Sequence, residues 1–201
     1  MIAALILGAA GVLTFRLFFL RAARVPTGAM SNTIIPGDHI FIYKLLGQPD
    51  RGDVVTFQRS AGSETLISRI IGLPGETIQV QGKLVYINGR ILDEQRVVAK
   101  EIGRGYDPLT EVSSEGRGPY RVFYTRHAPD SDGEFGVATP FQIPDNSYFL
   151  LGDNRDNSED SRYHGAVPRE LIWGKASVIY YSVKEPLQDE VRWDRMFKKV
   201  Q

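Results

Sequence analysis

The sequence predicts a mainly β protein in which an N-terminal membrane helix is followed by a β core with an inserted smaller lobe. Three observations predict this arrangement. Residues 1–15 carry no charge, residues 39–92 alternate apolar and polar side chains between turns, and residues 93–141 are richer in Gly, Ser, Asp and Glu. Long uncharged apolar runs are typical of membrane helices, and period-two alternation is typical of strands.

Composition narrows the class of protein. Lys plus Arg and Asp plus Glu number 24 each among the 201 residues, so the net charge is zero and no nucleic-acid partner is indicated. The chain has no cysteine, which excludes disulfides, thiol catalysis and Cys-ligated metal. His39, His127 and His164 lie far apart in sequence without metal-ligand spacing, so we expect no metal and no cofactor.

Residues 1–22 are predicted to be a membrane anchor. Counted through Leu20, the apolar run reaches about 30 Å as a helix, the thickness of the hydrocarbon core. A cleaved signal peptide is the alternative, but a basic start and a small-residue cleavage site are both missing. The basic residues of this region all lie toward its C-terminal side: Arg16, Arg21 and Arg24. By the positive-inside rule this bias would keep the rest of the chain cytoplasmic, a conflict that a translation start upstream of Met1 would remove.

The β core is predicted from short alternating runs, and we assign residues 23–92 and 142–183 to it. The predicted strands cover residues 39–45, 54–57, 65–71, 77–80, 83–87, 90–92, 143–151 and 176–182. Asn88-Gly89 is a typical two-residue hairpin turn, and Gly72-Leu73-Pro74-Gly75 is a typical tight turn. We expect no helix between residues 36 and 92.

The remaining segments are an inserted lobe, residues 93–141, and a tail, residues 184–201. The lobe has one weak strand at residues 120–125 and a surface histidine, His127. The tail mixes charges with large apolar side chains and suits a short amphipathic helix that packs against the core.

The most polar stretch is residues 151–162, LGDNRDNSEDSR. Its density of turn-forming residues predicts a loop whose side chains hydrogen-bond their own backbone. One interpretation is a solvated acidic surface loop. The other is a polar network that forms the floor of an active site, with Asp160 and Arg162 as an ion pair.

Three segments, in their order and spacing, resemble the type I signal peptidases, which are membrane-anchored serine endopeptidases with a Ser/Lys dyad. They are residues 25–34 (VPTGAMSNTI), 67–76 (ISRIIGLPGE) and 152–162 (GDNRDNSEDSR). The resemblance implies a β core of the signal peptidase type with a groove for the signal peptides of exported preproteins. It also implies a single-pass protein of the cytoplasmic membrane, in contact with the lipid bilayer, whose β domain lies on the outer, periplasmic or extracellular, face.

The resemblance assigns roles to particular positions. The nucleophilic serine is expected at position 29 and the lysine base at position 68. Thr27 and the backbone N–H at position 29 would form the oxyanion hole, and Ser158 would orient the base. The residues expected to hold the floor together are Arg69, Asp153, Asp160 and Arg162. We expect positions 29 and 68 to face each other at the end of one groove, with Ser158 within reach of position 68.

Both halves of the dyad are replaced in this chain. Position 29 is Ala29, which has no hydroxyl for covalent attack, and position 68 is Ser68, which cannot act as a general base near neutral pH. Arg69 cannot take over this role, because a guanidinium does not deprotonate in proteins. A proline that is usual in the first segment is Asn32.

Three explanations remain open. The first is a natural non-catalytic family member that keeps the peptide groove, either as a membrane-tethered binding or regulatory module or as a helper of an active signal peptidase. The second is an engineered active-site knockout. Ala29 alone would suit a knockout, but the further changes to Ser68 and Asn32 make this explanation less economical. The third is rewired catalysis, with Ser31 or Thr27 as nucleophile and His39 or His164 as base. A soluble self-cleaving Ser/Lys repressor is disfavoured, because no DNA-binding helix pair precedes the β region.

Overall fold

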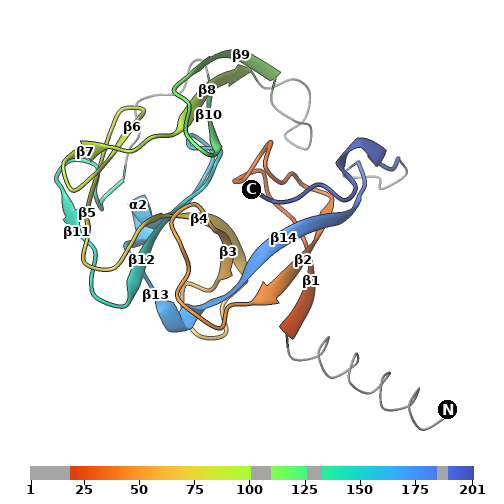
Figure 1. Ribbon diagram of the computed structural model, residues 1–201, viewed down its shortest axis with the longest axis horizontal. Helices are drawn as coiled ribbons and strands as arrows, with labels where there is room; N and C mark the ends of the chain where they lie inside the picture. Colours follow the sequence, from red (N-terminus) through yellow and green to blue (C-terminus); the bar gives the residue numbers. More distant parts are fainter. Residues whose placement is uncertain (1–18, 101–109, 126–132, 185–189) are drawn as a thin grey trace, which may run out of the picture.

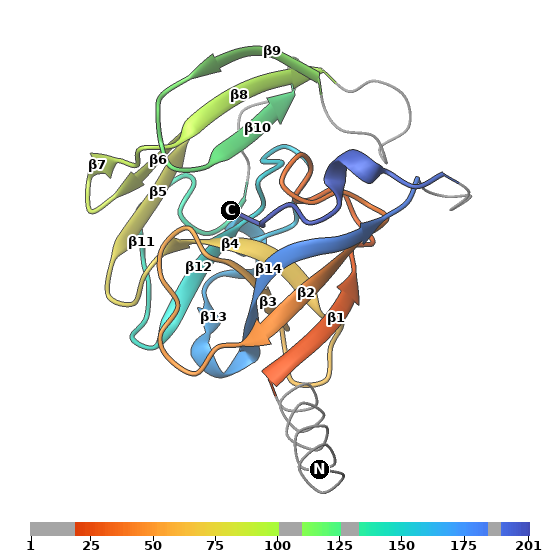
Figure 2. The same ribbon diagram turned by 45° about the vertical axis from the view of Figure 1, so that its right-hand side comes forward.

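The computed structural model describes residues 19–100, 110–125, 133–184 and 190–201, and it confirms a mainly β protein. Its largest sheet has seven strands in the order β1-β2-β14-β3-β4-β12-β13. Their bounds are β1 (Leu20–Arg24), β2 (Asp38–Lys44), β14 (Ile172–Ser182), β3 (Val54–Phe57), β4 (Leu66–Gly72), β12 (Ser147–Leu151) and β13 (Val167–Pro168). The sheet curls from β1 at one side to β12 and β13 at the other (Figures 1 and 2).

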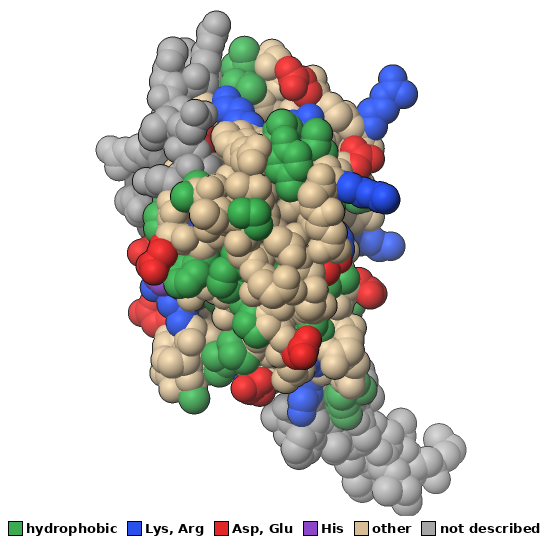
Figure 3. Space-filling view, turned by 90° about the vertical axis from the view of Figure 1, so that its left-hand side faces the viewer, with side chains coloured by type: hydrophobic (Ala, Val, Ile, Leu, Met, Phe, Trp, Pro, Cys, Tyr) green, Lys and Arg blue, Asp and Glu red, His purple; other side chains and the backbone are tan. Residues whose placement is uncertain are grey.

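Two smaller sheets cover the rest of the β structure. One has the order β11-β5-β6-β7, with β11 (Phe141–Gln142), β5 (Thr77–Gln81), β6 (Leu84–Ile87) and β7 (Arg90–Ile91). The other has the order β10-β8-β9, with β8 (Gln95–Lys100), β9 (Thr110–Glu115) and β10 (Arg121–Thr125). Figure 3 views the molecule from the side of β5, β6 and β7, where charged side chains lie mostly toward the edges of the face.

Local chemistry explains the predicted hairpin. The loop between β6 and β7 has only two residues, Asn88 and Gly89, with φ of 51° and 76°. A two-residue turn with positive φ at both positions matches the right-handed twist of the strands it joins, and Asn-Gly is the sequence that adopts it most readily. This prediction is confirmed.

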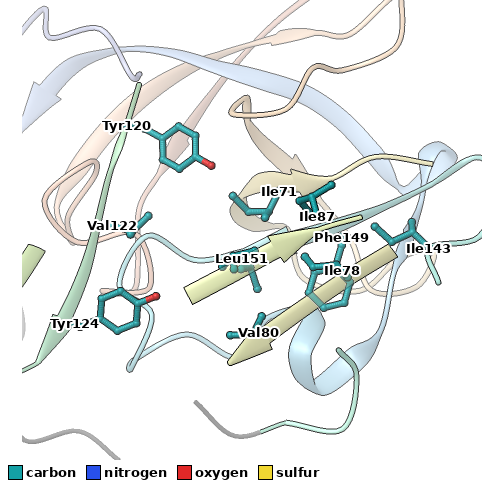
Figure 4. Packing of buried hydrophobic residues seen from close by; sticks show 11 residues of the cluster. Ile71, Ile78, Val80, Ile87, Tyr120, Val122, Tyr124, Ile143, Phe149 and Leu151 are labelled. Atoms are coloured by element: carbon teal, nitrogen blue, oxygen red, sulfur yellow. The ribbon is translucent and has the colours of Figure 1, made fainter. Parts of the chain in front are cut away.

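One apolar cluster joins the lobe to the core (Figure 4). Val122 and Tyr124 of β10, with Tyr120 just before it, pack with side chains of β4, β5, β6 and β12. Each of these side chains is at least nine-tenths buried, and burial of one large apolar side chain stabilises the fold by roughly 1.5–3 kcal/mol. The lobe is therefore attached to the core next to Leu151 by packed side chains, as well as by its two chain connections.

The N-terminal region and the tail differ from the expectations. Residues 20–22, which we assigned to the anchor, lie in β1, while residues 1–18 and His127 lie outside the described part of the chain. None of the helices in the described residues has the length and apolar character needed to span a membrane. In place of an amphipathic helix, the tail has a short 3-10 turn, η2 (Trp193–Arg195). Arg192 and Arg195 of the tail are buried, and their guanidinium groups donate to Pro36 and Asp38 of the core. Trp193, in contrast, is 75% exposed.

The remaining helical pieces are short. They are α2 (Ser161–His164), directly after the polar stretch, and the 3-10 turn η1 (Arg169–Leu171), directly before β14. The lobe also contains β8 and β9, two strands that the sequence analysis did not predict.

Candidate functional site

A buried ion pair between Arg69 and Asp153 forms the centre of the site floor. Nε of Arg69 donates to one carboxylate oxygen at 2.7 Å and an NH2 group to the other at 2.6 Å, and neither side chain is more than 1% exposed. Arg69 also donates to the carbonyl oxygens of Gly52 (2.7 Å) and Gln201 (2.9 Å). Burial alone would lower the pKa of Arg69, but the charge and hydrogen bonds of Asp153 outweigh burial and raise it. The pair joins β4 to the polar loop.

A second buried pair, Asp160 with Arg162, closes the loop on itself. Nε of Arg162 lies 2.8 Å from Oδ1 of Asp160, and the other carboxylate oxygen accepts the backbone N–H of Gly152 at 3.0 Å. Arg162 also donates to the carbonyl oxygen of Arg155 at 2.6 Å. Asp160 is in addition the N-cap of α2, where its side chain accepts the backbone N–H of Arg162. The polar network that the sequence suggested for residues 151–162 is thus present, and the solvated-loop interpretation is wrong for these two residues.

A third buried pair links the loop to the lobe, and sequence reasoning missed it. Arg155 binds Glu94 through both NH groups, donates to Tyr124 Oη at 3.2 Å and reaches the carbonyl of Gly152 at 3.1 Å. Burial lowers the pKa of Arg155, but the charge of Glu94 more than compensates and raises it well above its ordinary value. Glu94 gave no signal in the sequence, since its partner lies 61 positions away.

The segment that carries Ala29 is held against this floor. The backbone N–H of Asn154 donates to the Ala29 carbonyl at 3.0 Å, and its side-chain amide donates to the Gly28 carbonyl at 3.1 Å. A Cβ placed on Gly152 would lie 2.6 Å from the Ala29 carbonyl oxygen and 2.2 Å from the Ser158 hydroxyl. Gly152 is therefore required by close approach, and the structure brings Ala29 and Ser158 together around it.

Ser68 lies in β4, one residue before Arg69. It is 5% exposed, and its hydroxyl donates to the carbonyl oxygen of Ile67 at 2.8 Å. Since Arg69 binds Asp153, the strand that carries Ser68 runs beside the same loop that holds Ala29. Thr27, the expected oxyanion residue, is exposed at the surface of the segment before Ala29.

The geometry does not favour rewired catalysis. The hydroxyl of Ser31 is buried and donates to the carbonyl oxygen of Gly28 at 2.7 Å. His39 lies in β2 with its ring 5.5 Å from that of Tyr181, and His164 Nε2 lies 3.9 Å from a carboxylate oxygen of Glu159. The two imidazoles therefore face an aromatic ring and a carboxylate, and no hydrogen bond joins either to a candidate nucleophile among the described residues.

Asn32 has a structural reason of its own. Its φ is 72°, in the left-handed region that Asn tolerates and proline, with φ fixed near −65°, cannot adopt. The turn that follows Ala29 thus suits the residue present and not the proline that the resemblance leads one to expect there.

Two strand edges of the large sheet lie near a cavity. β1 is an edge strand of the large sheet, and β12 pairs with β4 only from Arg69 onward, which leaves residues 66–68 paired on one side among the described strands. A cavity of about 450 Å³ lies near these edges, and its lining includes residues 21–23 of β1, Ile42, Trp173 and Thr65 just before β4. Ala29 and Ser68 are not part of this lining. Two open backbone edges beside one cavity suit an extended peptide.

Comparisons with known proteins identify the family of this chain. A family model described as signal peptidase, peptidase S26, matches residues 1–181. A signal peptidase I of Rickettsia canadensis is 34% identical over 203 residues, covering 86% of this chain and 76% of the relative. A probable signal peptidase I-2 of Synechocystis sp. is 33% identical over 177 residues, covering 84% of this chain and 66% of the relative.

Among solved structures, a signal peptidase I from Enterococcus faecalis shares 27% identity, with a TM-score of 0.38 over 65% of this chain and 98% of that one. The assignment rests on the sequence matches, and the family model spans residues 25–34, 67–76 and 152–162. The chain belongs to the signal peptidase family, peptidase S26.

Proposed function

We propose that this chain is a non-catalytic signal peptidase homologue that binds the Ala-x-Ala end of the signal peptides of exported preproteins. The observation that carries the proposal is the cavity lined from β1 to Thr65, three residues before Ser68, which we call the groove. The two positions expected to react carry Ala29 and Ser68. Backbone hydrogen bonds along strand edges give affinity, and shallow pockets for small side chains give selectivity. Neither requires a serine nucleophile or a lysine base.

Absence of catalysis follows from side-chain chemistry. Peptide hydrolysis of this type needs a hydroxyl that attacks and a neutral amine that takes its proton. Alanine offers neither group, and the Ser68 hydroxyl is occupied with its own backbone. We therefore expect the chain as it stands to hold a peptide without cutting it.

The left-handed turn at Asn32 supports natural divergence over deliberate inactivation. A knockout made in an active enzyme would change the nucleophile and leave the following turn as it was. Here the position two residues after Met30 has a backbone conformation that excludes the usual proline. The base position, Ser68, has changed as well. A knockout would require only the change at Ala29, whereas natural divergence accounts for the changes at all three positions.

The sequence of residues 1–20 supports a place at the membrane. An apolar run of this length, directly before β1, would tie the groove to the outer face of the cytoplasmic membrane. There the chain could retain exported preproteins or present them to an active signal peptidase. Both roles use the same groove.

Peptide binding and turnover can be measured together. The purified full chain is titrated with a fluorescent peptide ending in Ala-x-Ala and with a matched peptide ending in Leu-x-Leu, and cleavage is followed by mass spectrometry over hours. We expect saturable binding of the first peptide, weaker binding of the second, and no product from either. Equal binding of both peptides would contradict a groove that selects small side chains. Cleavage of either peptide would show that the chain is catalytically active.

A matched pair of variants locates the binding. Ala23→Phe places a large ring in the cavity, whereas Ala61→Phe places one in an exposed loop. We expect only the first to abolish binding, while both melt near the temperature of the parent chain. Loss of binding in both variants, or in neither, would place the peptide elsewhere.

A further inference from the structure

The groove carries two basic side chains on one face, where β1 and β2 form its outer end. Arg21 of β1 pairs with Ile42 of β2, and Lys44 lies two residues beyond Ile42 on the same strand. Side chains two apart on a strand share a face, so Arg21 and Lys44 point to the same side of the sheet as Ile42. All three line the cavity.

These two charges have no compensating carboxylate among the described residues. Neither Arg21 nor Lys44 forms an ion pair with another described residue. Arg169, a third basic residue of the lining, instead donates to the carbonyl oxygens of Ile172, Leu45 and Gly47. Of the lining residues, Glu170 alone is acidic, and it is exposed. The lining therefore has an excess of positive charge, although the whole chain is neutral.

The neighbouring residues leave these two groups accessible. The guanidinium carbon of Arg21 lies 4.0 Å from the ring centroid of Trp173, which fixes its position through a cation–π contact and leaves its N–H edge free. Beside Lys44, the strand partner is Gly174, where a Cβ would lie 2.5 Å from the carbonyl oxygen of Tyr43. The sheet thus has no side chain at the position next to Lys44.

We propose that the outer end of the groove binds an acidic side chain of the peptide, so that the preferred ligand has an Asp or Glu upstream of its Ala-x-Ala end. The inference rests on the proposed peptide groove and adds a specificity for charge. Thr65 lines the cavity three residues before Ser68, and an extended chain advances about 3.3 Å per residue. If the last alanine lies opposite Ser68, the carboxylate is expected about three to five residues earlier.

A peptide fits these observations better than an anionic lipid headgroup. The basic pair lies on the edge strand β1 and its neighbour β2, and an extended peptide can pair with such an edge along its whole backbone. A headgroup would neutralise the charges and leave this edge unused.

The test uses Trp193→Phe, which leaves Trp173 as the single tryptophan of the full chain, so that its fluorescence reports on the groove. Two peptides ending in Ala-x-Ala are compared, one with Asp and one with Asn four residues before the last alanine. We expect the Asp peptide to bind about tenfold more tightly at low salt, as one charge-assisted contact allows, with a smaller difference at high salt.

Matched variants assign the effect to the two residues. Arg21→Gln and Lys44→Gln should remove the preference for Asp, and Arg21→Lys should keep part of it, because it keeps the charge. Arg90→Gln and Lys198→Gln remove the same charges from exposed positions outside the cavity lining and should leave the preference unchanged.

The outcomes are distinguishable. If the Asp and Asn peptides bind equally, the charge specificity is wrong while the proposed groove stands. If neither binds, the groove falls as well. If vesicles of phosphatidylglycerol, but not of phosphatidylcholine, change the Trp173 signal and displace the Asp peptide through Arg21 and Lys44, the site belongs to a lipid headgroup and the peptide specificity is overturned.

Discussion

The floor of the candidate site and the two positions that we propose once carried the dyad are built in opposite ways. Arg69, Asp153, Asp160 and Arg162 are each no more than 2% exposed and bind one another or the backbone through several charged hydrogen bonds. Ala29 makes only backbone contacts with the floor, and Ser68 binds its own strand. Loss of one partner of a buried ion pair leaves an unpaired buried charge, which strongly destabilises the fold. Replacement of a reacting side chain by a small neutral one leaves no such charge and costs little stability. On the proposed function, this contrast explains how a hydrolase framework is retained after its chemistry is lost.

Asp153→Asn tests the floor most severely. It leaves Arg69 charged, buried and short of its partner, which typically costs about 3–5 kcal/mol. Chemical denaturation should show a loss of that order in the free energy of unfolding. The control is Glu159→Gln, which removes an ion pair with Arg59 whose glutamate is 69% exposed and should cost less than about 1 kcal/mol. Similar losses of unfolding free energy in both variants would mean that the buried pair of the floor contributes no more stability than an exposed surface pair.

Gly152→Ala tests the contact between the floor and the Ala29 segment. The added Cβ would meet the Ser158 side chain and the Ala29 carbonyl at under 3 Å, so backbone has to move, at a cost of about 1–3 kcal/mol. Peptide binding should weaken as well, because the Ala29 segment is displaced. Gly47→Ala is the control, since a Cβ there meets nothing within 4 Å. Unchanged stability in Gly152→Ala would contradict the close approach.

Asn32→Pro asks whether the turn after Ala29 has diverged from the family. Proline cannot adopt a φ of 72°, so we expect a loss of more than about 1 kcal/mol in the free energy of unfolding. Asn32→Gly permits the same φ and should remain within about 0.5 kcal/mol of the parent. If the proline variant were as stable as the parent, the turn would be an ordinary family turn, and a knockout would again be as good an explanation as natural divergence.

Tyr120→Phe has the smallest expected effect, and it concerns the junction of floor and lobe. Burial, reinforced by the charge of Glu94, raises the pKa of the Tyr120 hydroxyl above its usual value of about 10. A raised folded-state pKa gives stability that is complete below the unfolded pKa and is lost as the pH rises beyond it. The parent should therefore lose stability above about pH 10, and the variant should lose less.

At neutral pH the Tyr120→Phe variant should resemble the parent, because the hydroxyl is buried without a hydrogen-bond partner among the described residues. Thermal unfolding across the pH range measures both effects. Parallel curves for parent and variant would show that Tyr120 is not part of the alkaline response.

Elements that depend on neighbouring residues could be predicted from the sequence, whereas elements that depend on long-range pairing could not. The Asn88-Gly89 hairpin and the strand at residues 54–57 depend on neighbouring residues, and both were predicted. β8 and β9 were missed because they lie in a polar segment and gain their order from packing. β1 was hidden by the apolar run that continues into it.

The site divides in the same way. Asp160 and Arg162 are two residues apart, so their pairing could be inferred from the sequence. The partners of Asp153 and Arg155 lie 84 and 61 positions away, and only the fold brings them together. Asn32 looked like a departure from a family pattern, and its reason, a left-handed backbone, is visible only in three dimensions.

Restoration of the dyad tests the central claim most directly. Ser68 is 5% exposed, so a lysine at its position would be desolvated and its pKa lowered toward the working range. In a cleavage assay with an Ala-x-Ala substrate, we expect the Ala29→Ser and Ser68→Lys double variant to exceed the parent by on the order of 10³-fold, with each single variant near the parent. A double variant that folds and binds the peptide yet cleaves nothing would contradict a framework retained in working geometry.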